Sequence, residues 1–122
     1  MNIWLAVFLG GGAGSMIRFA LSRAVLAFVG IAAFPVATLL SNLFATALLA
    51  WVMLRWELHL PGKEQWQALL AIGFCGGFST FSAFSMENHQ LLRDGFVGLA
   101  VLNIVISVVV GVLLFHLMAR SA

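Results

Sequence analysis

The sequence predicts an all-α integral membrane protein that forms a single transmembrane domain over residues 1–122. Hydrophobic residues make up 63% of the chain and charged residues only 8%, which places it outside the range of soluble domains. A short polar interval around residues 55–64 separates long apolar stretches on both sides. A hydrocarbon core about 30 Å thick is crossed by about 20 helical residues. We therefore expect four transmembrane helices, over about residues 3–28, 35–54, 66–92 and 95–118.

The first two spans carry features of helices that pack against other helices. The first contains a glycine cluster between Gly10 and Gly14, which would let another helix backbone approach closely. The second begins near Pro35, contains the polar patch TLLSN and ends close to Trp51, a residue type that favours the membrane interface. The exposed glycine face of the first span therefore needs a partner, and we expect the chain to form oligomers.

The third span contains an unusual passage, GFCGGFSTFSAFSMENHQ, which runs from Gly73 to Gln90. Glycine is costly inside a helix, so Gly76 and Gly77 predict a break in this span. Backbone that is bare at membrane depth is tolerated only when it is buried or lines a cavity. Carbonyl oxygens freed by the break could hold a hard monovalent cation. The alternative is that the two glycines only permit a tight helix crossing.

Polar and aromatic side chains after this break share one helical face. Thr80, Phe84 and Glu87 are spaced at i, i+4 and i+7, and Phe81 and Ser82 flank them. The edge of a phenyl ring is the positive end of its quadrupole, so rings presented edge-on favour an anion. The face therefore predicts an anion path, although phenylalanine and serine at helical spacing are also typical of ordinary membrane packing.

The remaining polar groups suit a weakly binding path. The amide NH2 groups of Asn42 and Asn103, like serine and threonine hydroxyls, are donors that can replace water around an anion. Conduction requires binding that is weak enough for release, and the spans contain no lysine that would hold the ion tightly. Small, dispersed donors predict selection of a small anion. The sequence leaves open whether Glu87 is charged or protonated.

Basic residues are balanced between the two sides that four spans define. An excess of lysine and arginine sets membrane orientation, so a balance predicts insertion in both orientations. Two oppositely oriented copies could then pair around a two-fold axis in the membrane plane. A weak bias toward one orientation is the alternative. The residues counted are Arg55, Lys63 and Arg120 on one side, and Arg23 and Arg93, with Arg18 nearby, on the other.

Other classes of function find little support. The basic residues are scattered and form no stripe for nucleic acid. His89 and His116 lie too far apart, without further ligands, to form a metal site. No set of nucleophile, base and acid is visible, so we do not expect an enzyme. The single cysteine, Cys75, lies in an apolar run where a packing role is expected.

Three segments together resemble the Fluc (CrcB) fluoride channels: GGGAGSMIRF in the first span, Asn42 after TLLS in the second, and GFCGGFSTFSAFSME in the third. The resemblance covers essentially the whole chain. It implies a channel that passively exports cytoplasmic fluoride across the bacterial plasma (inner) membrane. It also implies a dual-topology, antiparallel homodimer, surrounded by lipid, with two fluoride pores.

The resemblance also assigns roles to residues of the third span. Phe81 and Phe84 match the two pore phenylalanines, whose arrangement Asn42 would fix. A structural sodium ion, which is not transported, would be held at the dimer centre by the main-chain carbonyls of Gly76 and Ser79. Thr80 and Ser82 would add hydroxyls to the pore.

Further positions match the family with some departures. Arg18 matches an arginine of the vestibule and Glu87 a glutamate of the third span, while Asn103 and Ser107 fall where members of the family carry pore-lining groups. Ala83 replaces a threonine on the pore side and removes one hydroxyl. Ser79 also replaces a threonine, but a contact through its carbonyl would be unaffected. Gly111 offers no polar group at the next turn of the fourth span.

Two other functions fit a small protein with four spans. A small multidrug exporter couples protons through a carboxylate inside its first span, but residues 3–28 contain no acid. In a membrane assembly subunit that transports nothing, the polar third span would only hold helices together. Drug efflux coupled to protons would indicate the first, and the absence of any flux the second.

Overall fold

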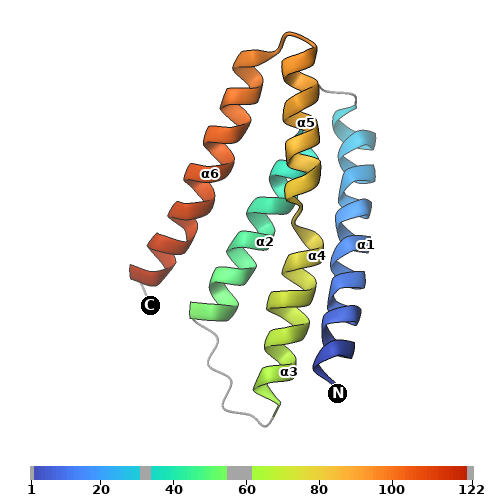
Figure 1. Cartoon of the computed structure of the whole chain (residues 1–122), viewed down its shortest axis with the longest axis vertical. Coiled ribbons are helices and arrows are strands. Elements are labelled where there is room, and N and C mark those ends of the chain that lie inside the picture. Colours follow the sequence, from blue (N-terminus) through green and yellow to red (C-terminus); the bar gives the residue numbers. More distant parts are fainter. Residues whose placement is uncertain (1, 31–33, 55–61, 121–122) are drawn as a thin grey trace.

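The computed structural model describes residues 2–30, 34–54 and 62–120, and these residues form helices and no strand (Figure 1). Four helical stretches are long and apolar enough to cross a membrane. The expected all-α fold with four spans is therefore confirmed. The elements are α1 (Ile3–Val29), α2 (Val36–Leu54), α3 (Lys63–Gln67), the π-helical segment η1 (Ala68–Cys75), α4 (Gly76–Phe78), α5 (Phe81–Arg93) and α6 (Val97–Arg120).

The elements from α3 to α5 together form the third span, Lys63–Arg93. Figure 1 shows α1 and α6 on opposite sides of the bundle, with α2 and the third span between them. The N-terminus, the end of α2 and the start of α3 lie at the lower end, and the turn between α5 and α6 lies at the upper end. Helix α1 packs against η1 and α4, whereas α6 packs against α2 and α5.

Short capping motifs set the ends of the helices. The side chain of Asn2 accepts a hydrogen bond from the Trp4 N–H at 2.8 Å and begins α1. The turn after α5 contains a glycine. Gly95 has φ 87°, and the Phe96 N–H donates to the Leu91 carbonyl at 2.7 Å. This tight turn brings α6 directly alongside α5.

Two glycines allow α1 to cross the third span at backbone contact. A Cβ atom on Gly14 would collide with the Phe74 carbonyl oxygen, and one on Gly77 would collide with the Gly11 carbonyl oxygen. Only residues without a side chain permit such an approach in a membrane. The expected close approach of another helix to the glycine cluster is confirmed, but the helix that covers it is the third span of the same chain and not a partner in an oligomer.

The break in the third span lies two residues beyond the position that the sequence suggested. Gly76 is helical, with φ −64° and ψ −39°, and begins α4 together with Gly77. The extended residues are Ser79 (φ −91°, ψ 156°) and Thr80 (φ −153°, ψ 118°). The prediction rested on the free-energy cost of glycine inside a helix, and it placed the break too early. Gly77 lies within a helix, where the absence of a side chain lets it pack against α1. The alternative reading of a tight crossing therefore holds for Gly77.

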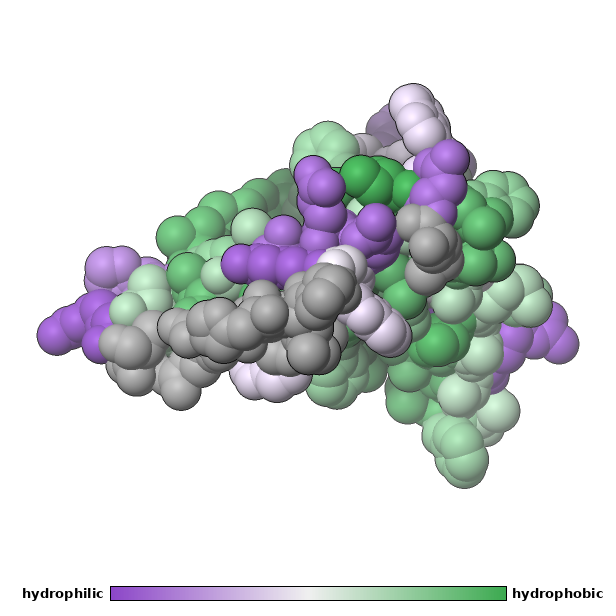
Figure 2. All heavy atoms as spheres, turned by 90° about the horizontal axis from the view of Figure 1, so that it is seen from below, coloured by the Kyte–Doolittle hydropathy of each residue, from purple (hydrophilic) through white to green (hydrophobic). Residues whose placement is uncertain are grey.

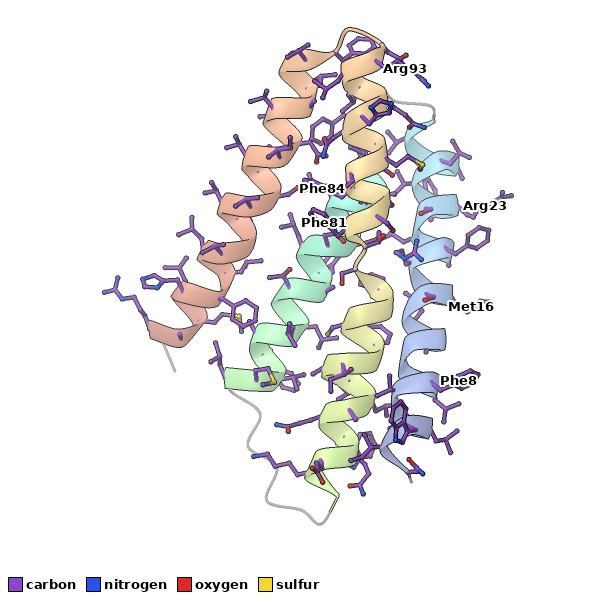
Figure 3. The ribbon with its side chains drawn as sticks, in the orientation of Figure 1. Phe8, Met16, Arg23, Phe81, Phe84 and Arg93 are labelled. Carbon is purple, nitrogen blue, oxygen red and sulfur yellow. The ribbon has the colours of Figure 1, made fainter. Side chains whose placement is uncertain are left out.

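The buried core of one chain is small, and most large apolar side chains face outward. The buried apolar residues of α2 and α6 are mainly small, such as Ala45 and Ala100. Phe8 and Met16 project away from α1 (Figure 3), and their exposed fractions are 75% and 70%. Figure 2 shows hydrophilic side chains across the middle of the lower end and hydrophobic ones along the flanks. Such a surface is suited to lipid or to another membrane chain.

Candidate functional site

Asn42 of α2 holds the extended backbone at the break. The Thr80 N–H donates to Asn42 Oδ1 at 2.8 Å, and Asn42 Nδ2 donates to the Thr80 carbonyl at 3.4 Å. A single amide side chain therefore satisfies both backbone groups of a residue that has left the helix. Unpaired backbone groups inside a membrane are costly, so this contact stabilises the break.

Side chains donate to two carbonyl groups near the break, those of Cys75 at the end of η1 and Gly77 in α4. The Ser79 N–H and the Ser79 hydroxyl both donate to the Cys75 carbonyl, at 3.0 and 2.8 Å. Arg18 Nε donates to the Gly77 carbonyl at 3.2 Å. Arg18, expected in a vestibule, is half-buried and lies beside the break. Its positive charge stands at the carboxyl end of the helix, where a cation is favourable.

Gly76 and Ser79 line one cavity of about 140 Å³ between α2 and the third span. In an uninterrupted helix the Thr80 N–H would donate to the Gly76 carbonyl, but here it donates to Asn42. The carbonyl of Gly76 is thus released from its usual donor. Among the described residues no group of three or more histidine, cysteine or acidic side chains could hold a metal. A cation at this place would have to use backbone and hydroxyl oxygen.

Phe81 and Phe84 form an aromatic pair directly above the break (Figure 3). Their ring centroids are 5.8 Å apart and the ring planes are tilted by 35°. Phe81 is the first residue of α5 and is 79% exposed, whereas Phe84 is half-buried. The backbone break thus fixes the height at which both rings are presented.

Thr80 and Ser82 place hydroxyl groups next to this aromatic pair. Thr80 caps α5, because its Oγ1 accepts a hydrogen bond from the Ala83 N–H at 3.2 Å. Its hydroxyl also shares a hydrogen bond of 3.2 Å with the exposed Ser82 hydroxyl. Capping therefore gives Thr80 a structural role in addition to any contact with an ion.

Glu87 is tied to α2 by a residue that the sequence reasoning missed. Thr38 Oγ1 donates to Glu87 Oε1 at 2.7 Å. The other carboxyl oxygen, Oε2, is buried and finds no hydrogen-bond partner within the described part of the chain. Thr38 precedes Asn42 by four residues, so the two polar side chains share one face of α2. This spacing could have identified Thr38 from the sequence. Glu87 contacts α2 through its side chain, whereas Thr80 contacts α2 through its backbone.

Asn88 is a second residue that the sequence reasoning missed. Asn103 Nδ2 donates to Asn88 Oδ1 at 2.9 Å, and the Ser107 hydroxyl donates to Asn103 Oδ1 at 3.4 Å. These bonds connect α5 to α6. The predicted pore residues Asn103 and Ser107 are thus brought together, at a separate place from the break.

A family model described as "CrcB-like protein, Camphor Resistance (CrcB)" matches residues 5–119 of this chain. Three relatives carry the name "Fluoride-specific ion channel FluC". The protein of Coxiella burnetii (strain CbuK_Q154) is 38% identical over 88% of this chain and 86% of its own length. That of Thermococcus onnurineus is 40% identical over 91% and 88%, and that of Novosphingobium aromaticivorans is 40% identical over 87% and 84%. These names describe ion channels, so the prediction that no enzyme is present is confirmed.

Proposed function

This chain belongs to the CrcB-like family, and we propose that it is a fluoride channel through which the ion moves passively down its electrochemical gradient. The observation that carries the proposal is the aromatic pair held above a backbone break. Phe81 and Phe84 lie beside the Thr80 and Ser82 hydroxyl groups within a membrane span. The four spans make the chain a multi-pass membrane protein, and its proposed site is the bacterial inner membrane, where it would export cytoplasmic fluoride.

The proposed path uses weak donors and ring edges in place of water. Fluoride would pass Thr80 and Ser82 beside the rings of Phe81 and Phe84, because hydroxyl donors and positive ring edges both favour a small anion. Each contact is individually weak, which allows the ion to leave as readily as it enters. Asn42 acts on this path by fixing the break from which both rings extend.

The upper part of the proposed path contains Glu87, Asn103 and Ser107. Ser107 can offer a hydroxyl donor, since its hydrogen bond to Asn103 is long at 3.4 Å. Glu87 lies near the same end of the span, where Thr38 orients one of its oxygens. Arg18 is proposed to raise the local anion concentration in a vestibule, because a fixed positive charge attracts anions to an entrance.

A second, inverted copy of this chain would complete the pore. The balanced basic residues favour both orientations, and the outward-facing apolar side chains need a cover. Phe81, which is 79% exposed in one chain, would be enclosed by the partner. Two copies related by a two-fold axis give two equivalent pores.

A sodium ion is proposed at the centre of this dimer as a structural element that is not transported. Gly76 and Ser79 line one cavity, and the Gly76 carbonyl has lost its usual helical donor. Backbone oxygen is the ligand type that a hard cation prefers. Each chain would supply two carbonyls, and the ion would link the two copies.

The experiment that tests the proposed function is fluoride efflux from liposomes that contain the purified protein. A fluoride electrode follows release after a potassium ionophore removes the membrane voltage, and chloride release is measured in parallel. Rapid fluoride release with little chloride release is the expected result. No fluoride release from folded protein would contradict a channel and would favour a membrane assembly subunit instead.

A further inference from the structure

We infer that Asn88 is a positioning residue of the fluoride path, which holds the Asn103 amide so that its oxygen, and not its NH2 group, faces Ser107. The inference rests on the proposed function and adds a residue to it. Asn88 lies outside the aromatic pair and the break. It would act on the ion only through its neighbour.

The contact joins two deeply buried amides on different helices. Asn88 of α5 is 6% exposed and Asn103 of α6 is 1% exposed. The distance from Asn103 Nδ2 to Asn88 Oδ1 is 2.9 Å, which is ideal for a hydrogen bond. Buried polar groups are costly unless they are paired, so each amide strongly restricts the orientation of the other.

The direction of these hydrogen bonds depends on Asn88. A side-chain amide has a donor end and an acceptor end, whereas a serine hydroxyl can serve as either. Ser107 therefore adapts to the end of Asn103 that faces it. Because the NH2 group of Asn103 is directed to the Asn88 oxygen, the Asn103 oxygen faces Ser107 and accepts its hydroxyl hydrogen.

In this orientation the Ser107 hydroxyl makes only a weak hydrogen bond to Asn103 when no ion is bound. The bond from Ser107 to Asn103 is 3.4 Å long, so the hydroxyl can turn to a passing anion and return afterwards. If the amide were reversed, its NH2 group and the Ser107 hydroxyl would both be donors toward an anion. Two converging donors would hold the ion more tightly and slow its release.

The neighbourhood limits the movement of Asn88. The preceding residue, Glu87, accepts a hydrogen bond from Thr38 of α2 at 2.7 Å. Successive residues of a helix point in different directions, so α5 is attached to α2 and to α6 at the same height. The backbone that carries Asn88 is thus held between these two helices.

The test compares Asn88→Leu with Asn88→Gln, and uses His89→Ala, an exposed neighbour, as a matched control. Fluoride efflux per folded protein is measured over a range of internal fluoride concentrations. Leucine removes the acceptor, and we expect the maximum rate to fall about tenfold, as for the loss of one buried hydrogen-bond partner. We also expect a lower half-saturating concentration. Glutamine keeps a neutral amide oxygen as acceptor and should restore both values toward those of the unmodified protein, and His89→Ala should not change them.

A second measurement asks whether Asn88 acts through Asn103. If it does, Asn88→Leu should have little further effect in a background that already carries Asn103→Leu. An equal effect in both backgrounds would overturn the inference, as would unchanged efflux in Asn88→Leu. Should Asn88→Leu fail to fold, a folded Asn88→Gln protein with slow efflux would overturn it as well. If the unmodified protein releases no fluoride, the proposed function itself fails.

Discussion

Asn42 and Thr80 form a two-point contact in which the Thr80 N–H donates to Asn42 Oδ1 at 2.8 Å and Asn42 Nδ2 donates back to the Thr80 carbonyl at 3.4 Å. The contact lies where the third span is not helical. The backbone groups of Thr80 bond to a side chain from α2 in place of backbone partners within a helix. The position of the aromatic pair therefore depends on a residue 38 positions earlier in the chain.

Replacement of Asn42 by leucine should weaken both the fold and the conduction of fluoride. The Thr80 N–H would be left without a partner in an apolar setting, which costs about 1–3 kcal/mol of unfolding free energy. Unfolding in detergent and liposome efflux measure the two effects. Met53→Leu on the same helix is the control, because the Met53 side chain is 54% exposed. Equal stability of the two variants would contradict the role given to Asn42.

Phe81→Ile and Phe84→Ile should each slow fluoride efflux while leaving the folded protein intact. Isoleucine keeps much of the apolar surface but has no ring edge to offer an anion. Phe8→Ile on α1 is a matched control, since Phe8 is 75% exposed and points away from the site. Efflux from liposomes separates these variants. If all three proteins release fluoride at the same rate, the aromatic pair does not line the path.

Most of the fold could be predicted from the sequence because the bilayer restricts a chain so strongly. Apolar stretches of the right length identified four spans, and the polar passage identified the third as interrupted. The exact place of the break could not be predicted. Gly76 and Gly77 carry the local signal, but the contact with Asn42 decides that Ser79 and Thr80 are the extended residues.

The candidate site was predictable in part for a similar reason. Side chains of the third span stood out by their polarity and spacing, so Phe81 and Glu87 could be named as candidates from the sequence. Thr38 and Asn88 were missed because their importance arises from partners on other helices. A single sequence shows which residues share a face, but not which faces meet.

Gly14→Ala should destabilise the protein, whereas Gly12→Ala should not. A methyl group at position 14 would collide with the Phe74 carbonyl, and separating the helices or straining their backbones costs about 1–3 kcal/mol. Gly12, on the same helix, has nothing within 4 Å of the added Cβ, and alanine is favoured over glycine in a helix by up to about 1 kcal/mol. Thermal unfolding in detergent compares the two variants. Equal loss of stability at both positions would mean that α1 does not cross the third span at Gly14.

Removal of sodium should lower stability without changing the driving force for fluoride. An ion held by the carbonyls of Gly76 and Ser79 in the folded dimer stabilises it through mass action, by about 2.7 kcal/mol at 100 times the dissociation constant. The unfolding temperature should therefore rise with sodium concentration at constant ionic strength, with N-methylglucamine as the replacement cation. A structural ion does not move with fluoride, so an imposed sodium gradient should leave the equilibrium distribution of fluoride unchanged. Accumulation of fluoride driven by that gradient would contradict a passive channel, and an unfolding temperature that does not respond to sodium would remove the cation from the proposed dimer centre.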